Sequence, residues 1–293
     1  MDQLADFEDL LKRAIGLSAA SIGSPMIARA VRARLSVCRL DDPLAYLARV
    51  RASETELQEL IEAVIVPETW FFRDRESFAA LARLGYEHSQ RSREGVLSVL
   101  SLPCSTGEEP YSMAMALLDA GVGADRFHVD AVDVSARALA HAGPAVYGKN
   151  SFRGDDLTFR DRHFETTAQG HRLSDHVRRQ VRFQPGNLFA ADVLPGLAVY
   201  DVIFCRNVLI YFDRPTQDRA IAVLNRLLRA DGTLFVAPAE TALPTSHGLV
   251  STSEPLAFAF RKAAATRRTP ATTTARRSIS IRITPTRRFT WPS

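Results

Sequence analysis

The sequence predicts an α/β protein with a doubly wound, mostly parallel sheet, preceded by a small all-helical domain. First, residues 1–65 carry apolar residues at three- and four-residue steps, a spacing typical of helices. Second, from about Val66 short apolar runs alternate with helical patterns, and strands separated by helices usually pair in parallel. Third, 46% of the 293 residues are hydrophobic, which suffices for one large core and a small domain.

The helical segment 1–65 contains four amphipathic stretches. They read FEDLLKRAIGL, PMIARAVRARLSVCRL, DPLAYLARV and ETELQELIEAVIV. Ser24-Pro25 and Asp42-Pro43 are cap-then-proline pairs of the kind that start helices. The second stretch carries Arg29, Arg32 and Arg34, and by itself such a row is most simply a solvated helix face.

Residues 66–262 show the alternation of strands and helices. Five strands and a hairpin are expected, at Val96–Leu102, Phe127–Val132, Val181–Gln184, Asp201–Cys205, Thr233–Ala237 and 249–260. Helices are expected at 74–90, 108–120, 135–142 and 215–229. Asp213 is the expected cap of the last helix, and Asp231-Gly232 its expected end. Residues 148–180 have little periodicity and are expected to form an insert over the site.

The charge distribution argues against a nucleic-acid partner. The net charge is +4, but nine of the 37 basic residues and none of the 33 acidic ones lie in residues 261–293. Residues 1–260 therefore hold 28 basic and 33 acidic residues, a net charge of −5. The basic excess belongs to the Thr/Arg/Pro-rich stretch 263–293, which we expect to be a disordered tail.

Several classes of protein are excluded by composition. No apolar run approaches the ~20 residues that span a bilayer, so we expect no membrane insertion. The acidic start MDQLADFEDL is unlike a signal peptide, and the three cysteines show no CxxC spacing. The histidines form no metal-ligand pattern. We therefore expect a protein of the cytoplasm without a metal, and we also expect a monomer.

The turn between the first strand and its helix is the most informative stretch. In PCSTGEEPYS, two carboxylates, Glu108 and Glu109, stand where a phosphate-binding turn would present glycines and bare N–H groups. Such carboxylates would repel a phosphate. They can simply cap the helix, or one of them can grip a cation such as an α-amino group. We expect Glu108 to make that contact and Glu109 to be the cap.

Polar residues follow the next three strands as well. Asp133 ends the second strand, where an acid can accept the two hydroxyls of a ribose. Asn187-Leu188 follow the third strand and Arg206-Asn207 the fourth, with Tyr211 close behind. A ligand with an amine and a ribose but no phosphate fits this set, and S-adenosylmethionine is such a ligand.

Five blocks of the sequence closely resemble the CheR-type chemoreceptor methyltransferases. The blocks are PETWFFRD, CSTGEEPYSMAMAL, AVDVSARAL, GNLF and FCRNVLIYFD. The resemblance covers about residues 5–260, and the N-terminal stretch is most similar to the branch of the Wsp surface-sensing, biofilm-controlling pathway. It implies a Rossmann-like fold with a seven-stranded sheet and methyl transfer from S-adenosylmethionine to glutamates of a methyl-accepting receptor, a cytoplasmic helical bundle.

The resemblance also implies roles for individual residues. Glu108 would bind the methionine amino group and Asp133 the ribose, while Asn187, Leu188, Arg206 and Asn207 would line the remaining cofactor. Thr69 and Arg73 would reach the cofactor from the preceding linker. Arg73 and Tyr211 match the family's substrate-side, catalytic residues. Arg29, Arg32 and Arg34 would face the receptor.

The implied chemistry agrees with the absence of a His–Asp or Cys–His constellation, because a glutamate is already ionised at neutral pH and needs no general base. Relatives of the Wsp branch usually continue into tetratricopeptide repeats. No 34-residue repeat occurs in these 293 residues, so contacts made by such repeats are expected to be absent. Two alternatives stay open: a methyltransferase acting on a small molecule or nucleic acid, and a non-catalytic S-adenosylmethionine-binding scaffold.

Overall fold

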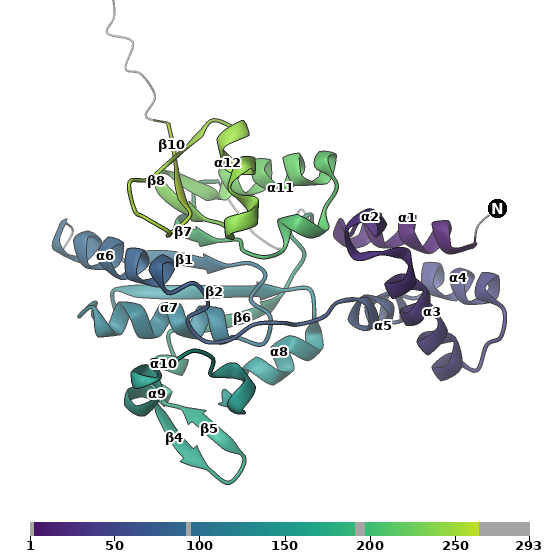
Figure 1. Ribbon diagram of the computed structural model, residues 1–293, viewed down its shortest axis with the longest axis horizontal. Coiled ribbons are helices and arrows are strands. Elements are labelled where there is room, and N and C mark those ends of the chain that lie inside the picture. Colours follow the sequence, from purple (N-terminus) through teal and green to yellow (C-terminus); the bar gives the residue numbers. More distant parts are fainter. Residues whose placement is uncertain (1–2, 92–94, 191–196, 264–293) are drawn as a thin grey trace, which may run out of the picture. The chain divides into compact units, whose positions relative to one another are not determined.

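The computed structural model describes residues 3–91, 95–190 and 197–263 (Figure 1). Its main feature is a seven-stranded sheet in the order β6-β2-β1-β7-β8-β10-β9. The strands are β1 (Leu97–Ser101), β2 (Phe127–Asp133), β6 (Val181–Pro185), β7 (Tyr200–Phe204), β8 (Leu228–Phe235), β9 (Leu249–Ser251) and β10 (Ala259–Lys262). The first five pair in parallel, and β10 runs antiparallel to β8 and β9. The predicted doubly wound, mostly parallel sheet is confirmed.

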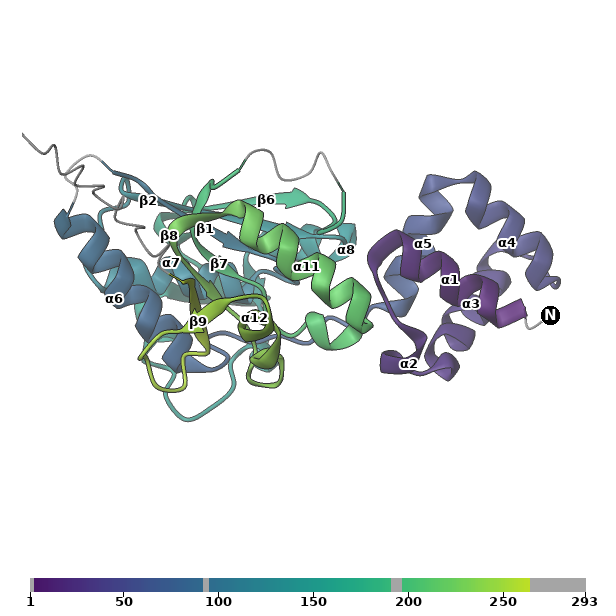
Figure 2. The ribbon, with the colours of Figure 1, turned by 90° about the horizontal axis from the view of Figure 1, so that it is seen from above.

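The two faces of the sheet are covered by different helices. The helices are α6 (Arg75–Arg91), α7 (Glu108–Asp119), α8 (Ala136–Ala142), α11 (Arg214–Leu227) and α12 (Ala242–Ser246). Val99 of β1 belongs to the apolar cluster that includes α6 and α7, whereas its neighbour Leu100 belongs to the cluster that includes α11. Alternate residues of a strand point to opposite faces, so β1 is buried on both. Figure 2 shows α11 lying along the sheet.

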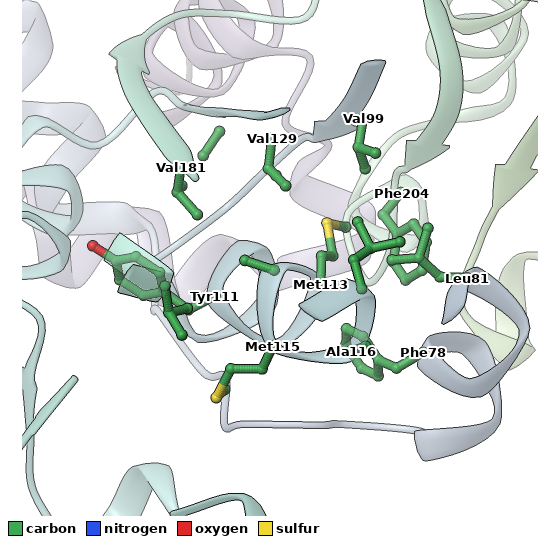
Figure 3. Packing of buried hydrophobic residues seen from close by; sticks show 14 of the residues in the cluster. Phe78, Leu81, Val99, Tyr111, Met113, Met115, Ala116, Val129, Val181 and Phe204 are labelled. Atoms are coloured by element: carbon green, nitrogen blue, oxygen red, sulfur yellow. The ribbon is translucent and has the colours of Figure 1, made fainter. Parts of the chain in front are cut away.

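Helix α7 packs on the centre of the sheet. Val99, Val129 and Val181, from three neighbouring strands, face this helix in Figure 3, and Met113 and Ala116 of α7 lie in the same cluster. Close packing of this kind fixes the direction of α7 and of its first turn relative to the end of β1.

The insert forms a small sheet of its own. Its elements are β3 (Val146–Tyr147), η1 (Lys149–Ser151), α9 (Thr158–His163), β4 (Phe164–Thr167), β5 (Gly170–Leu173) and α10 (Asp175–Arg178), with strand order β3-β5-β4. Phe71, from the linker before α6, contacts the rings of Phe152, Phe164 and Tyr147. The insert is thereby fixed to the segment just before α6.

The N-terminal region is entirely helical apart from one isolated bridge between Leu17 and Phe212. It comprises α1 (Gln3–Ile15), α2 (Ala19–Ile22), α3 (Ser24–Cys38), α4 (Pro43–Ala52) and α5 (Glu54–Val64). These helices share one apolar cluster around Phe7, Ile27, Tyr46 and Leu60. The described residues belong to one compact unit, Met1–Ala263, so the domain boundary expected near residue 65 stays a prediction.

Two local predictions at the ends of helices were wrong. Gly23, not Ser24, is the N-cap of α3, whereas Asp42, Ser135 and Asp213 do cap their helices through their side chains. Helix α11 ends at Leu227, and the chain enters β8 at once, so Asp231-Gly232 lies inside that strand. Gly232 is needed there because a Cβ would come within 3.0 Å of the Asp201 carbonyl oxygen.

Among the residues that the structure describes, no helix is long and apolar enough to cross a membrane. The tail expected at 263–293 lies outside the described residues from Ala264 on.

We predict that Glu56→Gln lowers the free energy of unfolding by about 2–3 kcal/mol at neutral pH, because Glu56 pairs with Arg34 and accepts the Tyr46 hydroxyl in a buried network. Burial works to raise the pKa of Glu56, but the bonds from Arg34 and Tyr46 outweigh it and lower that pKa. The stabilisation is thus complete above the ordinary carboxyl pKa of about 4 and is lost as pH falls through the folded value.

Urea unfolding at neutral and acidic pH measures this difference. Glu54→Gln, an exposed change in the first turn of the same helix, is the control and should cost less than about 0.5 kcal/mol. Equal unfolding curves for Glu56→Gln and the wild type at neutral pH would contradict the prediction.

Candidate active site

A cavity of about 450 Å³ opens at the carboxyl ends of β1, β2 and β7. This volume lies within the ~300–1,000 Å³ range of small-molecule sites, and the position is where doubly wound sheets bind ligands. Its polar lining includes Thr69, Arg73, Ser105, Glu109, Asp133, Arg206, Asn207 and Tyr211. Its apolar lining includes Ile15, Leu17, Met26, Val64, Val134 and Ala138.

The turn after β1 brings α7 to the cavity. Ser105 and Gly107 have φ values of 49° and 96°, both left-handed, and Gly107 is the N-cap of α7. A Cβ on Gly107 would lie 2.8 Å from the Tyr147 hydroxyl and 2.9 Å from the Ala142 Cβ. Only glycine fits this turn, so the single glycine of the motif serves the backbone conformation.

The two carboxylates of this turn have different surroundings. The hydroxyls of Thr106 and Ser151 donate to the two Glu108 oxygens at 2.6 and 2.8 Å, and Glu108 is buried. In the described part of the chain the cavity lining includes Glu109 and not Glu108. The structure differs from the expectation here: Glu108 is tied to the insert, and Glu109 is the acid that faces the cavity.

Glu109 is part of an ionic cluster with Arg206. Its carboxylate accepts the Ser101 hydroxyl at 2.8 Å and an Arg206 nitrogen at 3.3 Å. Arg206 is 1% exposed and also donates to the Arg73 carbonyl at 3.0 Å and to the Asp74 carboxylate. Burial raises the pKa of Glu109, and the positive charge of Arg206 opposes that shift.

Asp133 stands at the end of β2 with its side chain in the cavity wall. Its two oxygens accept the backbone N–H groups of Ser105 at 2.7 Å and Ser135 at 2.8 Å. Burial raises the pKa of Asp133, and these N–H bonds act against the rise. Within the described residues, the buried Ser105 hydroxyl nearby has no hydrogen-bond partner. Two polar groups with spare capacity therefore face this part of the cavity.

Thr69 and Arg73 enter the cavity from the segment that precedes α6. The Arg73 guanidinium lies 4.5 Å from the centre of the Trp70 ring and donates to the Glu68 carbonyl at 3.1 Å. In the described part of the chain no carboxylate pairs with Arg73 within 4.0 Å. Its charge is therefore available to an anion in the cavity.

Asn207 and Tyr211 reach the cavity from the loop after β7, which Glu240 holds in place. Glu240 is fully buried and accepts the backbone N–H groups of Asn207, Leu209, Ile210 and Ala237, at distances from 2.8 to 3.4 Å. Asn207 has a left-handed φ of 60°. Tyr211 is 40% exposed, so it stands at the mouth of the cavity.

Three sequence-predicted groups lie elsewhere. Asn187 donates to the Ala14 carbonyl and Leu188 packs in the core beneath α11, and among the described residues neither belongs to the cavity lining. Arg29 and Arg32 are exposed on α3. Arg34 is 13% exposed and forms ion pairs with Glu56 and Glu59, so its charge is compensated within the helical region. Arg34 thus has internal partners, and the expectation that it faces a receptor stays a prediction.

Sequence reasoning missed two acids of this site. Glu109 was expected to be only a cap, and Glu240 was not singled out. The position of Glu109 beside Arg206 depends on the phase of α7 against the sheet, which no local pattern reveals. Within the described residues, no group of three or more His, Cys, Asp and Glu side chains could hold a metal ion.

Comparison with known proteins gives consistent results. Residues 67–254 match a family model described as CheR methyltransferase, SAM binding domain. A probable biofilm formation methyltransferase WspC of Pseudomonas aeruginosa is 56% identical over 257 residues, which cover 87% of this chain and 61% of the relative. The WspC of Pseudomonas putida is 48% identical over 255 residues, which cover 87% of this chain and 60% of that relative. A chemotaxis protein methyltransferase of Klebsiella aerogenes is 36% identical over 239 residues, which cover 79% of this chain and 80% of that relative. The chain thus spans about three fifths of the two WspC relatives.

We predict that Glu240→Gln loosens the loop after β7, because an amide keeps one acceptor oxygen and turns an NH₂ group toward buried N–H donors. The expected cost is about 2 kcal/mol in unfolding free energy, with faster hydrogen exchange at Asn207 and Leu209. Glu254→Gln, at a partly exposed surface pair with Arg83, should change neither quantity measurably. Unchanged exchange in the loop would show that Glu240 does not hold it.

Proposed function

Because the chain belongs to the CheR methyltransferase family, we propose that it transfers methyl from S-adenosylmethionine to glutamate side chains of a methyl-accepting, chemotaxis-type receptor, giving glutamate methyl esters. The observation that carries the proposal is the match over residues 67–254 around a cavity whose Arg73 pairs with no carboxylate among the described residues. The identity to probable biofilm formation methyltransferases supports a place in surface-sensing signalling.

The residues of the cavity fit S-adenosylmethionine. When bound, this cofactor supplies an electrophilic methyl group on a sulfonium centre. The unpartnered Ser105 hydroxyl, in the described part of the chain, and the Asp133 carboxylate can meet a ribose. Apolar residues such as Val134 and Ala138 can cover an adenine. Thr69, Arg206 and Asn207 would line the rest.

We assign the methionine amino group to Glu109 in place of Glu108. The position of Glu109 in the cavity wall supports this assignment, as do the two hydroxyls that already occupy Glu108. The pairing of Glu109 with Arg206 leaves lone pairs on both oxygens for an ammonium group. Asn187 and Leu188 are not among the cavity-lining residues in the described part of the chain, and the cofactor contact expected of them stays a prediction.

The chain's own residues perform three tasks in this reaction. Arg73 holds the substrate carboxylate through charge-assisted hydrogen bonds. Tyr211, at the mouth, orients the incoming side chain. The apolar wall from Ile15 to Val64 excludes water from the reacting oxygen. A glutamate with a pKa near 4.3 is already ionised, so no residue is needed as a base.

The partner we propose is the cytoplasmic helical part of a receptor, which places the protein in the cytoplasm. The exposed Arg29 and Arg32 on α3 can meet an acidic receptor surface, and such exposed charges act mainly on association rate. Arg34 is left out of this surface because Glu56 and Glu59 neutralise it.

Asp133→Ala and Glu109→Gln are each expected to weaken binding of S-adenosylhomocysteine by about 10-fold or more, since each removes an acceptor for a ribose or an amine. Glu108→Gln should change the dissociation constant by less than about threefold. Isothermal calorimetry on the folded variants measures this. Full affinity in Asp133→Ala would remove the ribose assignment, and a larger loss in Glu108→Gln than in Glu109→Gln would restore Glu108.

We predict that the wild type forms base-labile methyl esters on a receptor's cytoplasmic domain from tritium-labelled S-adenosylmethionine. Arg73→Ala should retain cofactor affinity and lose turnover by about 100-fold. The matched control is Arg153→Ala, whose guanidinium also lies 4.5 Å from the Trp70 ring. Arg153 is not among the cavity-lining residues in the described part of the chain, and we expect its loss to cost less than about threefold.

The outcomes separate the alternatives. Cofactor binding without methyl esters on any receptor would favour a scaffold. Base-stable label on a small molecule or nucleic acid would favour a different methyltransferase. Equal losses in Arg73→Ala and Arg153→Ala would mean that Arg73 acts only through Trp70.

A further inference from the structure

The backbone that carries Arg73 has an unusual conformation. Phe72 and Asp74, on either side of Arg73, have φ values of 54° and 58°. Both lie in the left-handed region, which residues with a Cβ rarely adopt because it brings side chain and carbonyl together. Such conformations persist only where the surrounding structure holds them. Two left-handed residues on either side of Arg73 therefore indicate a turn that contacts with the surrounding structure hold in place.

Three hydrogen-bonded ties hold this turn. The Phe71 N–H donates to the Ser151 carbonyl at 2.9 Å. The Phe72 N–H donates to the Ser112 hydroxyl at 2.9 Å. Arg206 donates to the Arg73 carbonyl at 3.0 Å and to the Asp74 carboxylate. Consecutive residues are thus fixed to the insert, to α7 and to the loop after β7.

The hydrogen bond between the Phe72 N–H and Ser112 depends on the serine hydroxyl. Ser112 is fully buried on α7, and its hydroxyl donates to the Glu108 carbonyl one turn earlier at 2.6 Å. That bond directs an oxygen lone pair outward to the Phe72 N–H. Alanine is the better helix former and would keep α7 intact. It would leave the Phe72 N–H without this acceptor and free the turn to relax.

The turn decides where the Arg73 side chain goes. With Phe72 and Asp74 left-handed, the Arg73 guanidinium lies over Trp70 and in the cavity wall. A shift of either neighbour toward ordinary φ values would rotate the Cα–Cβ bond of Arg73 away from that wall.

We propose that Ser112 is a positioning residue for methyl transfer: its hydroxyl locks the left-handed turn at Phe72–Asp74 and thereby aims the Arg73 guanidinium into the cavity. The proposal rests on the function proposed above, in which Arg73 holds the substrate carboxylate. Asp74, through Arg206, supplies the second lock.

Trp70 gives a test that needs no turnover. The chain has two tryptophans, and Trp291→Phe leaves Trp70 alone as the reporter of the two guanidinium groups beside its ring, those of Arg73 and Arg153. In that background Ser112→Ala should shift the emission maximum in the direction that Arg73→Ala shifts it. Ser77→Ala is the matched control, because Ser77 is equally buried on neighbouring α6 and donates to the Ala257 carbonyl. It should leave the emission unchanged.

Kinetics give the second test. Ser112→Ala should lower kcat for receptor methylation by about tenfold or more and leave the dissociation constant of S-adenosylhomocysteine within about threefold. In an Arg73→Ala background the same substitution should lower kcat by less than about twofold, because its effect passes through Arg73. Ser77→Ala should be neutral in both backgrounds.

An unshifted Trp70 emission, or a loss of kcat that persists in full without Arg73, would overturn the proposal and leave Ser112 a purely structural residue. If Ser112→Ala does not fold, Asp74→Asn, at a partly exposed position, replaces it in both tests. It should shift the Trp70 emission in the same direction, and its effect on kcat should likewise disappear in the Arg73→Ala background. Absence of methyl esters with the wild type would count against the proposed function alone, since the emission of Trp70 still reports whether Ser112 positions Arg73.

Discussion

The guanidinium of Arg206 is a full positive charge held almost entirely out of water, and the geometry of the cavity depends on it. A charge in such a place is tolerated only where acceptors and opposite charges surround it. Here they come from the turn before α6, through the Arg73 carbonyl and Asp74, and from α7, through Glu109. Arg206 itself follows β7. One side chain therefore links three segments that line the cavity: the turn before α6, the first turn of α7 and the loop after β7.

The sequence predicts most of the sheet because its central strands β1, β2 and β7 are largely buried and alternate with clear helix signals. β1 and α7 begin and end within one residue of their expected limits. The error at the end of α11 has a physical cause. Asp231-Gly232 is a strong local stop signal, but Leu228 is fully buried and pairs with Tyr200 of β7, so tertiary pairing draws the chain into β8 at once. Asp231-Gly232 therefore lies within β8, at the point where this strand passes close to β7.

The polar residues of the site are predictable only in part. Asp133 and Arg206 follow apolar strands, and a charged residue in that position must face either a site or a partner, so both could be expected near the cavity. The sequence favours Glu108 over Glu109, but local pattern alone does not decide which of them faces the cavity, because adjacent residues of a helix point about 100° apart and the phase is set by packing against the sheet. One of the two hydroxyls that donate to Glu108 belongs to Ser151, 43 residues later in the insert. Glu240 binds backbone N–H groups, which leave no trace in the sequence.

The proposed function requires that one cavity hold two carboxylates and still attract a third. Asp133 is compensated by two backbone N–H groups, and Glu109 by Arg206 and the Ser101 hydroxyl. Both are thus neutralised locally, while the neighbouring Arg73 has no carboxylate partner within the described residues. The charge of Arg73 acts on Glu109, but its guanidinium forms no ion pair there, so it can attract an anion beside the compensated acids. For the function proposed above, this arrangement suits a carboxylate nucleophile, which needs alignment and no base.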